Sequence, residues 1–253
     1  MTEGIRGMGD ETIDDLQYKG LKLIQKKQGF RFGVDAVLLA NFVQIKKNDF
    51  VLDIGTGTGI IPILLAGKTQ ASKIVGIDIQ QEMAEMAKRS VVLNSLQERV
   101  KIIHGDIKNG TEYFSSSQFN VIVSNPPYMK KGGGLVNNHD SKAIARHEIT
   151  CTLEDIIKES SRIVAAGGRL AMVHRPERMV DVITLMRNYT IEPKIIRFVH
   201  PYPNAEPNLF LIQGTKGGNP GLKIQSPLYV YDSQCNGEAR YSDEINRIYD
   251  RKE

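Results

Sequence analysis

The chain has 253 residues, which is long enough for one large α/β domain and too short for two substantial domains joined by a linker. It carries 33 lysines and arginines against 29 aspartates and glutamates, and this net charge of +4 permits contact with nucleic acid without demonstrating it. The N-terminus has no apolar signal segment and no apolar run is long enough to span a bilayer, which predicts a cytoplasmic protein that does not enter a membrane.

Short β-branched runs alternate with helical patterns from about Asp35 onward, and this alternation is typical of βαβ units around a parallel sheet. Before it, residues 21–25 and 30–32 are expected to form a small hairpin, and Asp35 to cap a helix that ends at Val43. The expected strands are Phe50–Ile54, Lys73–Asp78, Val100–His104, Asn120–Ser124, Arg169–His174, Ile195–Val199 and Leu209–Gly214. The expected helices are residues 60–66, 82–93 and 153–165, with another that begins at Pro176. The sequence therefore predicts an α/β fold, a doubly wound and mostly parallel seven-stranded sheet with helices on both faces.

Three segments are expected along the chain. Residues 1–45 form an N-terminal extension, a hairpin plus a helix packed on the core, and residues 46–216 form that core. Residues 217–253 form a C-terminal extension in which no motif indicates a role. Residues 132–142 are rich in glycine and polar side chains, and such a stretch beside a site is typical of a substrate-entry loop.

The cysteines and histidines do not predict a metal site. Cys151 and Cys235 lack the spacing of metal ligands and are expected to be reduced thiols. The five histidines are scattered singly along the sequence. A lone histidine is more often structural than a ligand, so we expect no metal.

A glycine-rich loop follows the first sheet strand. Glycines at this point allow a sharp turn from strand to helix and a close approach of the backbone to a ligand. A dinucleotide site is the alternative, but its spacing is Gly-x-Gly-x-x-Gly, whereas this loop reads Gly-x-Gly-x-Gly. The carboxylate two residues before the first glycine would repel a pyrophosphate, and it suits a ligand that carries an ammonium and a sulfonium group. The loop therefore favours S-adenosyl-L-methionine, with expected contacts from Asp53, Gly55, Thr56, Gly57 and Gly59.

Two further aspartates follow the next strands. Asp78 ends the second strand, where a carboxylate can accept hydrogen bonds from both ribose hydroxyls of either kind of cofactor. Asp106 follows the third strand, where it can accept from the exocyclic amine of the cofactor's adenine. A helix cap or a turn is an equally good interpretation of Asp106 taken alone. Ile79 and Ile107, which follow these aspartates, are expected to line the same cofactor site.

The tetrapeptide Asn125-Pro126-Pro127-Tyr128 follows the fourth strand and is the expected catalytic element. The Asn125 side-chain oxygen and the Pro126 carbonyl can each accept one N–H of a planar amine, which aims the nitrogen lone pair at a methyl group. Pro127 biases Pro126 toward an extended conformation, and Tyr128 can stack on a flipped base. Asn-Pro-Pro alone is also typical of a simple turn. Downstream of the glycine loop, the tetrapeptide favours methyl transfer, and Asn125 is also expected near the cofactor.

Residues 53–59, 78, 106 and 125–128 resemble the motifs of class I S-adenosylmethionine-dependent methyltransferases that act on amino groups. A narrower similarity, in residues 29–40, 125–128, 145–148 and 174–178, is to the bacterial tRNA1(Val) adenine-N6 methyltransferase family. This resemblance implies transfer of a methyl group to the N6 amine of the adenine 3′ of the anticodon. It also implies a monomer in which Phe32 and Asp35 lie against the cofactor.

Basic residues beside the tetrapeptide are the expected contacts of a tRNA substrate. Lys130, Lys131 and Arg146 are the candidates for a rim that holds the RNA backbone. Arg175 and Arg178 are weaker candidates, because an arginine near a helix start is often a solvated side chain. An anticodon loop suits such a site, since its unpaired bases are splayed out at low cost.

Three alternatives remain open. A glutamine methyltransferase of release factors also uses Asn-Pro-Pro-Tyr, but it carries a separate helical domain before the glycine loop, and here only 52 residues precede Asp53. A DNA adenine methyltransferase needs a duplex-reading domain, for which the residues after Tyr128 leave little room. A non-catalytic module that binds cofactor or RNA is the third alternative, against which the intact tetrapeptide argues.

Overall fold

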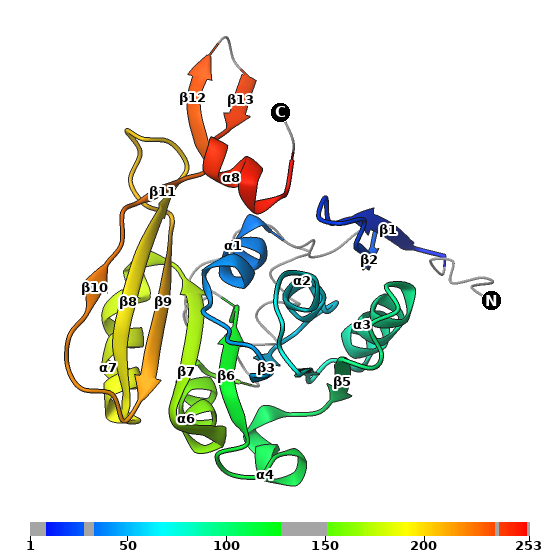
Figure 1. The fold of residues 1–253 in the computed structure, drawn as a ribbon, viewed down its shortest axis with the longest axis vertical. Coiled ribbons are helices and arrows are strands. Elements are labelled where there is room, and N and C mark those ends of the chain that lie inside the picture. Colours follow the sequence, from blue (N-terminus) through cyan, green and yellow to red (C-terminus); the bar gives the residue numbers. More distant parts are fainter. Residues whose placement is uncertain (1–8, 28–32, 128–150, 236–237, 252–253) are drawn as a thin grey trace.

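The computed structural model describes residues 9–27, 33–127, 151–235 and 238–251. Its central element is a nine-stranded sheet in the order β10-β8-β9-β7-β6-β3-β4-β5, with β11 paired to β8 (Figure 1). The main strands are β3 (Phe50–Ile54), β4 (Lys73–Asp78), β5 (Val100–His104), β6 (Phe119–Ser124), β7 (Val164–His174), β8 (Ile191–His200) and β9 (Leu209–Lys216). Neighbours among β3 to β7 are parallel, and β9 runs antiparallel between β7 and β8. The predicted doubly wound α/β fold is confirmed, and the seven predicted strands form its main sheet.

Helices cover both faces of the sheet and make two separate hydrophobic cores (Figure 1). One face carries α1 (Val34–Phe42), α2 (Ile60–Lys68) and α3 (Gln81–Leu93). The other carries α4 (Gly110–Tyr113), α6 (Leu153–Ile163) and α7 (Met179–Asn188), together with the short 3₁₀ helices η1 (Ile107–Asn109) and η2 (Pro176–Arg178). Adjacent residues of β3 show the alternation, since Val51 lies in the first core and Leu52 in the second. Strands buried on both faces explain why these segments read as continuous apolar runs.

The N-terminal hairpin consists of β1 (Glu11–Asp15) and β2 (Lys22–Lys26), which pair antiparallel. It is anchored on α3, where the Ile24 N–H donates to the Ser90 hydroxyl at 3.0 Å and Arg89 makes a bidentate ion pair with Glu11. The expected hairpin paired residues 21–25 with residues 30–32, which lie outside the described residues. Among the described residues, β2 pairs with the acidic segment β1, and Arg89 compensates part of the charge of that segment through Glu11.

Several helix boundaries differ from the predictions by a few residues, among them those of α1 and α6. Helix α1 has Gly33 as its N-cap, and the predicted cap Asp35 is the second residue of the helix. A Cβ atom on Gly33 would lie 2.5 Å from Asp35 Oδ1, so a glycine leaves the space that this carboxylate fills. Helix α6 ends at Ile163 rather than Ala165, because the backbone is already extended from Val164 into β7.

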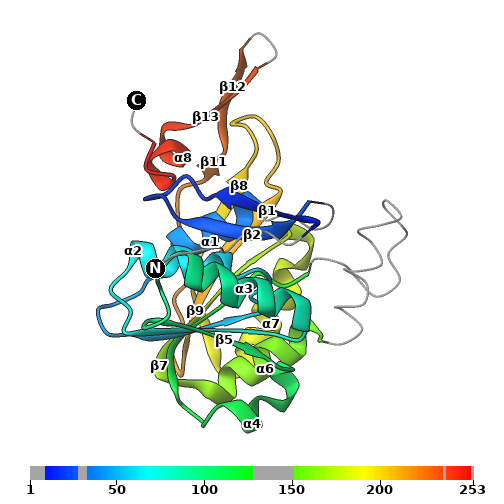
Figure 2. The same cartoon turned by 90° about the vertical axis from the view of Figure 1, so that its right-hand side faces the viewer.

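The C-terminal part of the chain adds a small appendage to the sheet. It comprises β10 (Lys223–Ile224), β11 (Leu228–Tyr229), β12 (Tyr231–Cys235), β13 (Glu238–Tyr241) and α8 (Asp243–Ile248). Strands β10 and β11 extend the β8 edge, and β12 pairs with β13 in a hairpin that projects from the body (Figures 1 and 2). Helix α8, capped by the Ser242 hydroxyl, places Ile245 and Ile248 in the first core.

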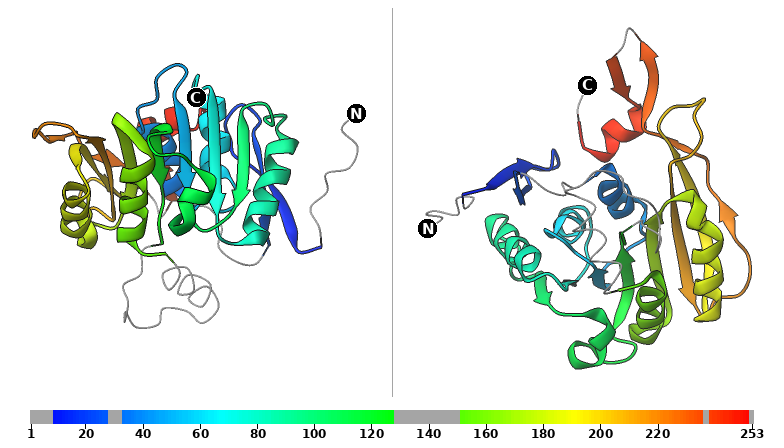
Figure 3. Two further views of the ribbon diagram at one scale, coloured as in Figure 1. Left: turned by 90° about the horizontal axis from the view of Figure 1, so that it is seen from below. Right: turned by 180° about the vertical axis from the view of Figure 1, so that it is seen from behind.

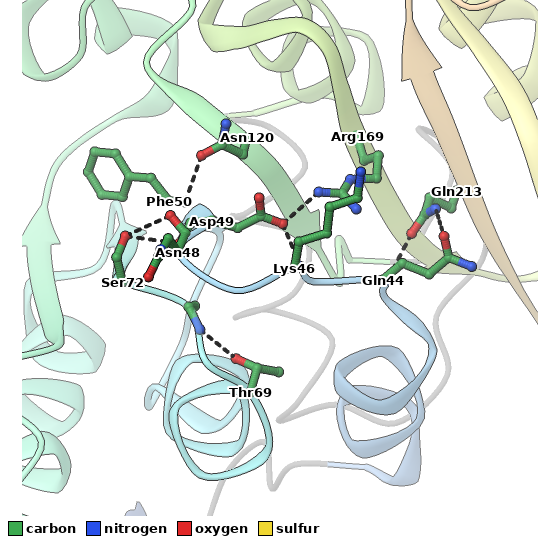
Figure 4. Close-up of polar contacts among 11 residues, drawn as sticks. Gln44, Lys46, Asn48, Asp49, Phe50, Thr69, Ser72, Asn120, Arg169 and Gln213 are labelled. Atoms are coloured by element: carbon green, nitrogen blue, oxygen red, sulfur yellow. Dashed lines mark hydrogen bonds and ion pairs between the residues drawn. The ribbon is translucent and has the colours of Figure 1, made fainter.

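Polar side chains hold the start of β3 at the edge where the parallel strands begin (Figure 4). Asp49 Oδ2 accepts from the Lys46 N–H at 2.7 Å and from Arg169 of β7 at 2.6 Å. Asn120 of β6 accepts from the Phe50 N–H at 2.8 Å. These contacts fix the register of β3 between its neighbours at the edge opposite to its glycine loop. None of the helices in the described ranges combines the length and apolar character that a bilayer crossing requires.

Candidate active site

The carboxyl ends of β3, β4, β5 and β6 meet at one edge of the sheet, which Figure 3 shows from two further directions. Ile54, the last residue of β3, is paired with Ile77 of β4 on one side and with Ser124 of β6 on the other. Asp78 is paired with His104 at the end of β5. The glycine loop, Asp78 and Asn125 therefore begin at the same level, and Asp106 follows two residues beyond it, although these residues lie far apart in the sequence.

The glycine loop turns the chain from β3 into α2. Gly55, Gly57 and Gly59 all have positive φ, at 73°, 56° and 88°. Such values are readily adopted only by glycine. The N–H groups of Gly55 and Thr56 donate to the Ile77 carbonyl at 2.9 and 3.1 Å, which ties the loop to the neighbouring strand β4. These hydrogen bonds hold the loop at the edge of the sheet where β4 ends.

Asp53 is completely buried in β3, with 0% of its surface exposed. Within the described residues, neither of its carboxylate oxygens has a hydrogen-bond partner. Burial raises the pKa of Asp53 to about 7, and Asp78 adds to this shift. The Thr56 hydroxyl opposes the shift, although its geometry does not complete a hydrogen bond to the carboxylate. A buried carboxylate without a partner is costly, so this position fits a ligand that brings a positively charged or hydrogen-donating group.

Gly76 is the residue of β4 directly opposite Asp53. A Cβ atom at this position would lie 2.6 Å from Thr56 Oγ1 and 2.9 Å from Ile102 Cδ1. The glycine therefore lets the Thr56 side chain pack down onto the sheet beside Asp53. The sequence analysis missed this residue, although a glycine inside a strand is a known sign of close approach.

Asp78 joins the glycine loop to the turn after β4. Its Oδ2 accepts from the Gly57 N–H at 2.8 Å and its Oδ1 from the Gln80 N–H at 2.9 Å. The side chain is 96% buried, since 4% of its surface is exposed. A carboxylate oxygen has two lone pairs, so accepting a backbone N–H does not by itself exclude a hydrogen bond from a ligand hydroxyl.

Asp106 caps η1 by accepting from the Lys108 N–H at 2.9 Å, and its other oxygen lies 3.7 Å from Lys108 Nζ. The helix-cap interpretation of this residue is therefore confirmed. Ile107 beside it is 5% exposed and packs in the second core. Ile79 is half-buried after β4, and its carbonyl lies 3.1 Å from His104 Nε2. This contact links the turns after β4 and β5.

Asn125, Pro126 and Pro127 follow β6 directly. The preceding Ser124 donates from its hydroxyl to the Ile54 carbonyl at 2.9 Å, which locks the end of β6 to the end of β3. Asn125 and Pro127 are half-buried, and Pro126 is buried. The predicted catalytic segment therefore starts beside the glycine loop, on the adjacent strand.

His174 ends β7 next to this segment. Ser124 is paired with Met172, so His174 lies two residues further along, at the level of Pro126. Burial lowers the pKa of His174 to about 4, with a smaller contribution from Arg178. Its Nδ1 accepts from the Arg175 N–H at 2.8 Å, which leaves the proton of the neutral ring on Nε2. The imidazole is thus an uncharged neighbour of the site.

Several predicted site residues lie outside the described residues. They are Phe32, Tyr128, Lys130, Lys131, Arg146 and the loop 132–142. Asp35 is described and is 8% exposed at the start of α1. In the ranges that the structure describes, no group of three or more histidine, cysteine, aspartate or glutamate side chains is arranged to hold a metal ion.

Comparison with known proteins decides the family. The model of the methyltransferase small domain matches residues 32–190, which include every strand from β3 to β7 and the whole sheet edge described above. The chain belongs to the methyltransferase small domain family. The methyltransferase class predicted from the sequence is therefore confirmed, and with it S-adenosyl-L-methionine as the methyl donor of this family.

Curated relatives of this methyltransferase extend the similarity beyond the family model. A tRNA1(Val) (adenine(37)-N6)-methyltransferase of Porphyromonas gingivalis is 30% identical over 204 residues, which cover 78% of this chain and 79% of that protein. One with the same description from Parabacteroides distasonis is 27% identical, over 92% of this chain and 94% of its own length. Among solved structures, a predicted O-methyltransferase of Agrobacterium tumefaciens has a TM-score of 0.69 at 22% identity, and the match covers 85% of this chain and 95% of the other. That structure supports the fold of the methyltransferase alone.

Proposed function

We propose that this methyltransferase transfers the methyl group of S-adenosyl-L-methionine to the N6 amine of adenine 37 in tRNA1(Val). The observation that carries the proposal is the hydrogen bond between the ends of β6 and β3, from Ser124 to Ile54. It brings the start of the Asn125-Pro126-Pro127 segment next to the start of the glycine loop, so an amine held by one lies beside a methyl donor held by the other. The curated relatives, which carry this activity in their names, support the choice of substrate.

The cofactor would lie along the carboxyl ends of β3, β4 and β5. The carboxylate of Asp53, which has no hydrogen-bond partner among the described residues, suits its positively charged methionine end. The carboxylate of Asp78, at the end of β4, is assigned to the ribose hydroxyls. We assign Asp106 and the apolar side chains beside it to the adenine of the cofactor. The proposed cofactor-binding residues are Phe32, Asp35, Asp53, Gly55, Thr56, Gly57, Gly59, Asp78, Ile79, Asp106, Ile107 and Asn125.

The chemistry of the chain is mainly positioning. The cofactor supplies an electrophilic methyl group. Asn125 Oδ1 and the Pro126 carbonyl accept the two N–H groups of the adenine amine, which points its lone pair along the line of displacement. Tyr128 stacks on the flipped base, a contact that typically costs about 1–3 kcal/mol when it is removed. The neutral His174 adds no positive charge beside the amine, and the methylated nitrogen releases its proton to water.

The RNA would approach from the side of the Asn125-Pro126-Pro127 segment. Lys130, Lys131 and Arg146 are the proposed phosphate contacts, and residues 132–142 the entry loop. We expect the protein to act as a cytoplasmic monomer without a metal. Residues 46–216 would form the catalytic core, with residues 1–45 and 217–253 as extensions on it.

Transfer of radiolabelled methyl from S-adenosylmethionine to three acceptors tests the proposal. The acceptors are unmodified bulk tRNA, a release factor and duplex DNA, each followed by analysis of the labelled product. Label recovered as N6-methyladenosine in tRNA is the expected result. Label in the release factor alone would instead assign the chain to the glutamine methyltransferases, and no label in any acceptor despite cofactor binding would contradict the proposal.

A further inference from the structure

Four tyrosines form a row of rings on the C-terminal side of the molecule, which we call the aromatic ladder: Tyr202, Tyr231, Tyr241 and Tyr249. Successive ring centroids are 5.3, 5.1 and 6.2 Å apart, with interplanar angles of 29°, 13° and 34°. Tyr249 is buried with 8% exposure, whereas the other three rings are half-exposed. All four lie beyond residues 32–190, the part of the chain that the family model matches.

Backbone pairing builds the ladder. Tyr231 of β12 and Tyr241 of β13 are direct partners in the antiparallel hairpin, which stacks their rings across the strands. The Tyr231 N–H donates to the Pro201 carbonyl at 2.9 Å, and this bond holds the hairpin beside the loop that carries Tyr202. That loop, residues 201–208, is closed by hydrogen bonds at both ends, including one that the Ala205 carbonyl accepts from His200 Nδ1 at 2.7 Å. The rings are therefore held in fixed positions before any ligand arrives.

An arginine completes the row. The Arg251 guanidinium lies 4.9 Å from the centroid of Tyr241 and 5.1 Å from that of Tyr249. Its Nε donates to Gln17 Oε1 in the N-terminal hairpin at 3.0 Å. Arg251 is nevertheless exposed. Proteins that bind single-stranded nucleic acids combine aromatic rings, on which bases stack, with a planar cation beside them.

The ladder borders the proposed active site at both of its ends. At one end, the loop that carries Tyr202 is bonded through the Asn208 carbonyl to Arg175 at 3.0 Å, and Arg175 directly follows β7 beside the Pro126 segment. At the other end, Tyr249 lies in the same hydrophobic core as the residues of α1. The pKa of Tyr249 is raised mainly by burial, and the charge of Asp35 at the start of α1 makes a smaller contribution. Figures 1 and 2 show the loop, the hairpin and α8 side by side above α1.

We propose that the aromatic ladder is the surface on which this methyltransferase stacks unpaired bases of its RNA substrate. The inference rests on the proposed function and adds a contact surface outside the family domain. Tyr231 and Tyr241 pack partly against the first core, yet they and Tyr202 keep part of their surface exposed to solvent. The rings already stack on one another, so an unpaired base would extend the row or lie along its exposed edges, and such contacts do not depend on the base sequence. In this proposal the aromatic ladder contacts bases, and the basic side chains contact phosphates.

Binding of a fluorescent, unmodified anticodon stem-loop by fluorescence anisotropy tests the proposal. The variants are Tyr202→Leu and Tyr241→Leu, each paired with its Tyr→Phe counterpart. The matched control is Tyr189→Leu. Tyr189 is half-buried, lies just before β8 begins and donates a hydrogen bond from its hydroxyl to Glu154. Titration with S-adenosylmethionine checks that each variant keeps its cofactor site. Arg175→Ala is added as a charge variant for comparison of salt dependence.

We expect the Leu variants at 202 and 241 to bind the stem-loop roughly tenfold more weakly, and the Phe variants to bind as the wild type does. Their slope of log affinity against log salt should be unchanged, whereas Arg175→Ala should reduce it if that side chain contacts a phosphate. Wild-type affinity in both Leu variants, or an equal loss in Tyr189→Leu, would overturn the proposal and leave the function standing, provided that the wild type methylates tRNA. Wild-type protein that methylates no tRNA would reject the function and the surface with it.

Discussion

The backbone N–H of Gly57 donates a 2.8 Å hydrogen bond to Oδ2 of Asp78, so the side chain expected to bind ribose also shapes the glycine loop. Asp78→Ala should therefore remove a ligand contact and loosen the loop at once. We expect the dissociation constant for S-adenosylmethionine to rise at least tenfold, about 1.4 kcal/mol, when it is measured by calorimetry. Glu112→Ala, which removes an exposed carboxylate from α4, is the control and should leave the affinity unchanged. Unaltered affinity in Asp78→Ala would show that the ribose is held elsewhere.

Asn125→Ala should separate catalysis from cofactor binding. If Asn125 Oδ1 accepts an N–H of the target amine, its removal lowers the turnover number by roughly a hundredfold or more, the usual cost of one oriented polar contact to the reacting group. The cofactor affinity should fall by much less than tenfold, since Asn125 is only one of the twelve proposed cofactor-binding residues. Single-turnover methyl transfer and calorimetry measure the two quantities, with Asn219→Ala, an exposed asparagine near β10, as the control. A tenfold loss of cofactor affinity would contradict this role for Asn125.

Asp53 makes the stability of the cofactor-free protein depend on pH. Burial raises the pKa of Asp53 to about 7 in the folded protein, against about 3.9 for an ordinary aspartate. Between these values the folded state binds more protons than the unfolded state, so the contribution of Asp53 to stability is present below about pH 4 and is lost as the pH rises toward 7. We expect Asp53→Asn to flatten the pH dependence of the free energy of unfolding over this range and to raise it at pH 8. Urea melts at several pH values measure the effect, and an identical pH profile in the variant would refute it.

Cofactor binding should release a proton for the same reason. The positively charged methionine end of S-adenosylmethionine stabilises the ionised carboxylate, so binding lowers the pKa of Asp53 and strengthens as the pH rises through about 7. Calorimetry at pH 6.5 in buffers of different ionisation enthalpy reports the proton directly. Asp53→Asn should abolish this release, and a wild type without it would show that Asp53 does not meet the ligand's charge.

Arg169 is expected to support the fold without taking part in catalysis. It reaches Asp49 at 2.6 Å, and the two side chains are 12% and 11% exposed. Arg169→Met leaves a largely buried carboxylate with only the Lys46 N–H, so we expect a loss of about 3 kcal/mol in the free energy of unfolding. Arg187→Met breaks the ion pair with Glu192, in which Arg187 is 60% exposed, and should cost less than about 1 kcal/mol. Thermal melts compare the two, and equal losses would contradict the assignment.

The sequence predicted the sheet because its strands are apolar on both faces and bounded by turns. The prediction failed where the local sequence pattern and the tertiary contacts favour different structures. The acidic segment of β1 has no strand-like alternation, and it becomes a strand because β2 pairs with it and Arg89 meets its charge. Aspartate is a common N-cap residue, yet the space beside Gly33 admits the Asp35 carboxylate inside the first turn of α1.

In the candidate site, too, some residues could be predicted from local sequence patterns and others could not. The acidic residues and Asn125 could be placed because each directly follows a predicted strand, and parallel strands end at one edge. The contact of Gly76 with Thr56 and the isolation of the Asp53 carboxylate depend on packing between strands, which no local pattern encodes. The row of Tyr202, Tyr231 and Tyr241 could not be predicted either, since it arises from the register of a hairpin beside a distant loop.

Methyl transfer to one tRNA with a changed base tests the central claim most directly. The measurement compares in vitro transcribed tRNA1(Val) carrying adenine 37 with the same transcript carrying guanine 37, using labelled S-adenosylmethionine and nucleoside analysis. The account predicts N6-methyladenosine from the first transcript and no label from the second. Equal labelling of both transcripts, or no labelling of either by a protein that binds the cofactor, would contradict it.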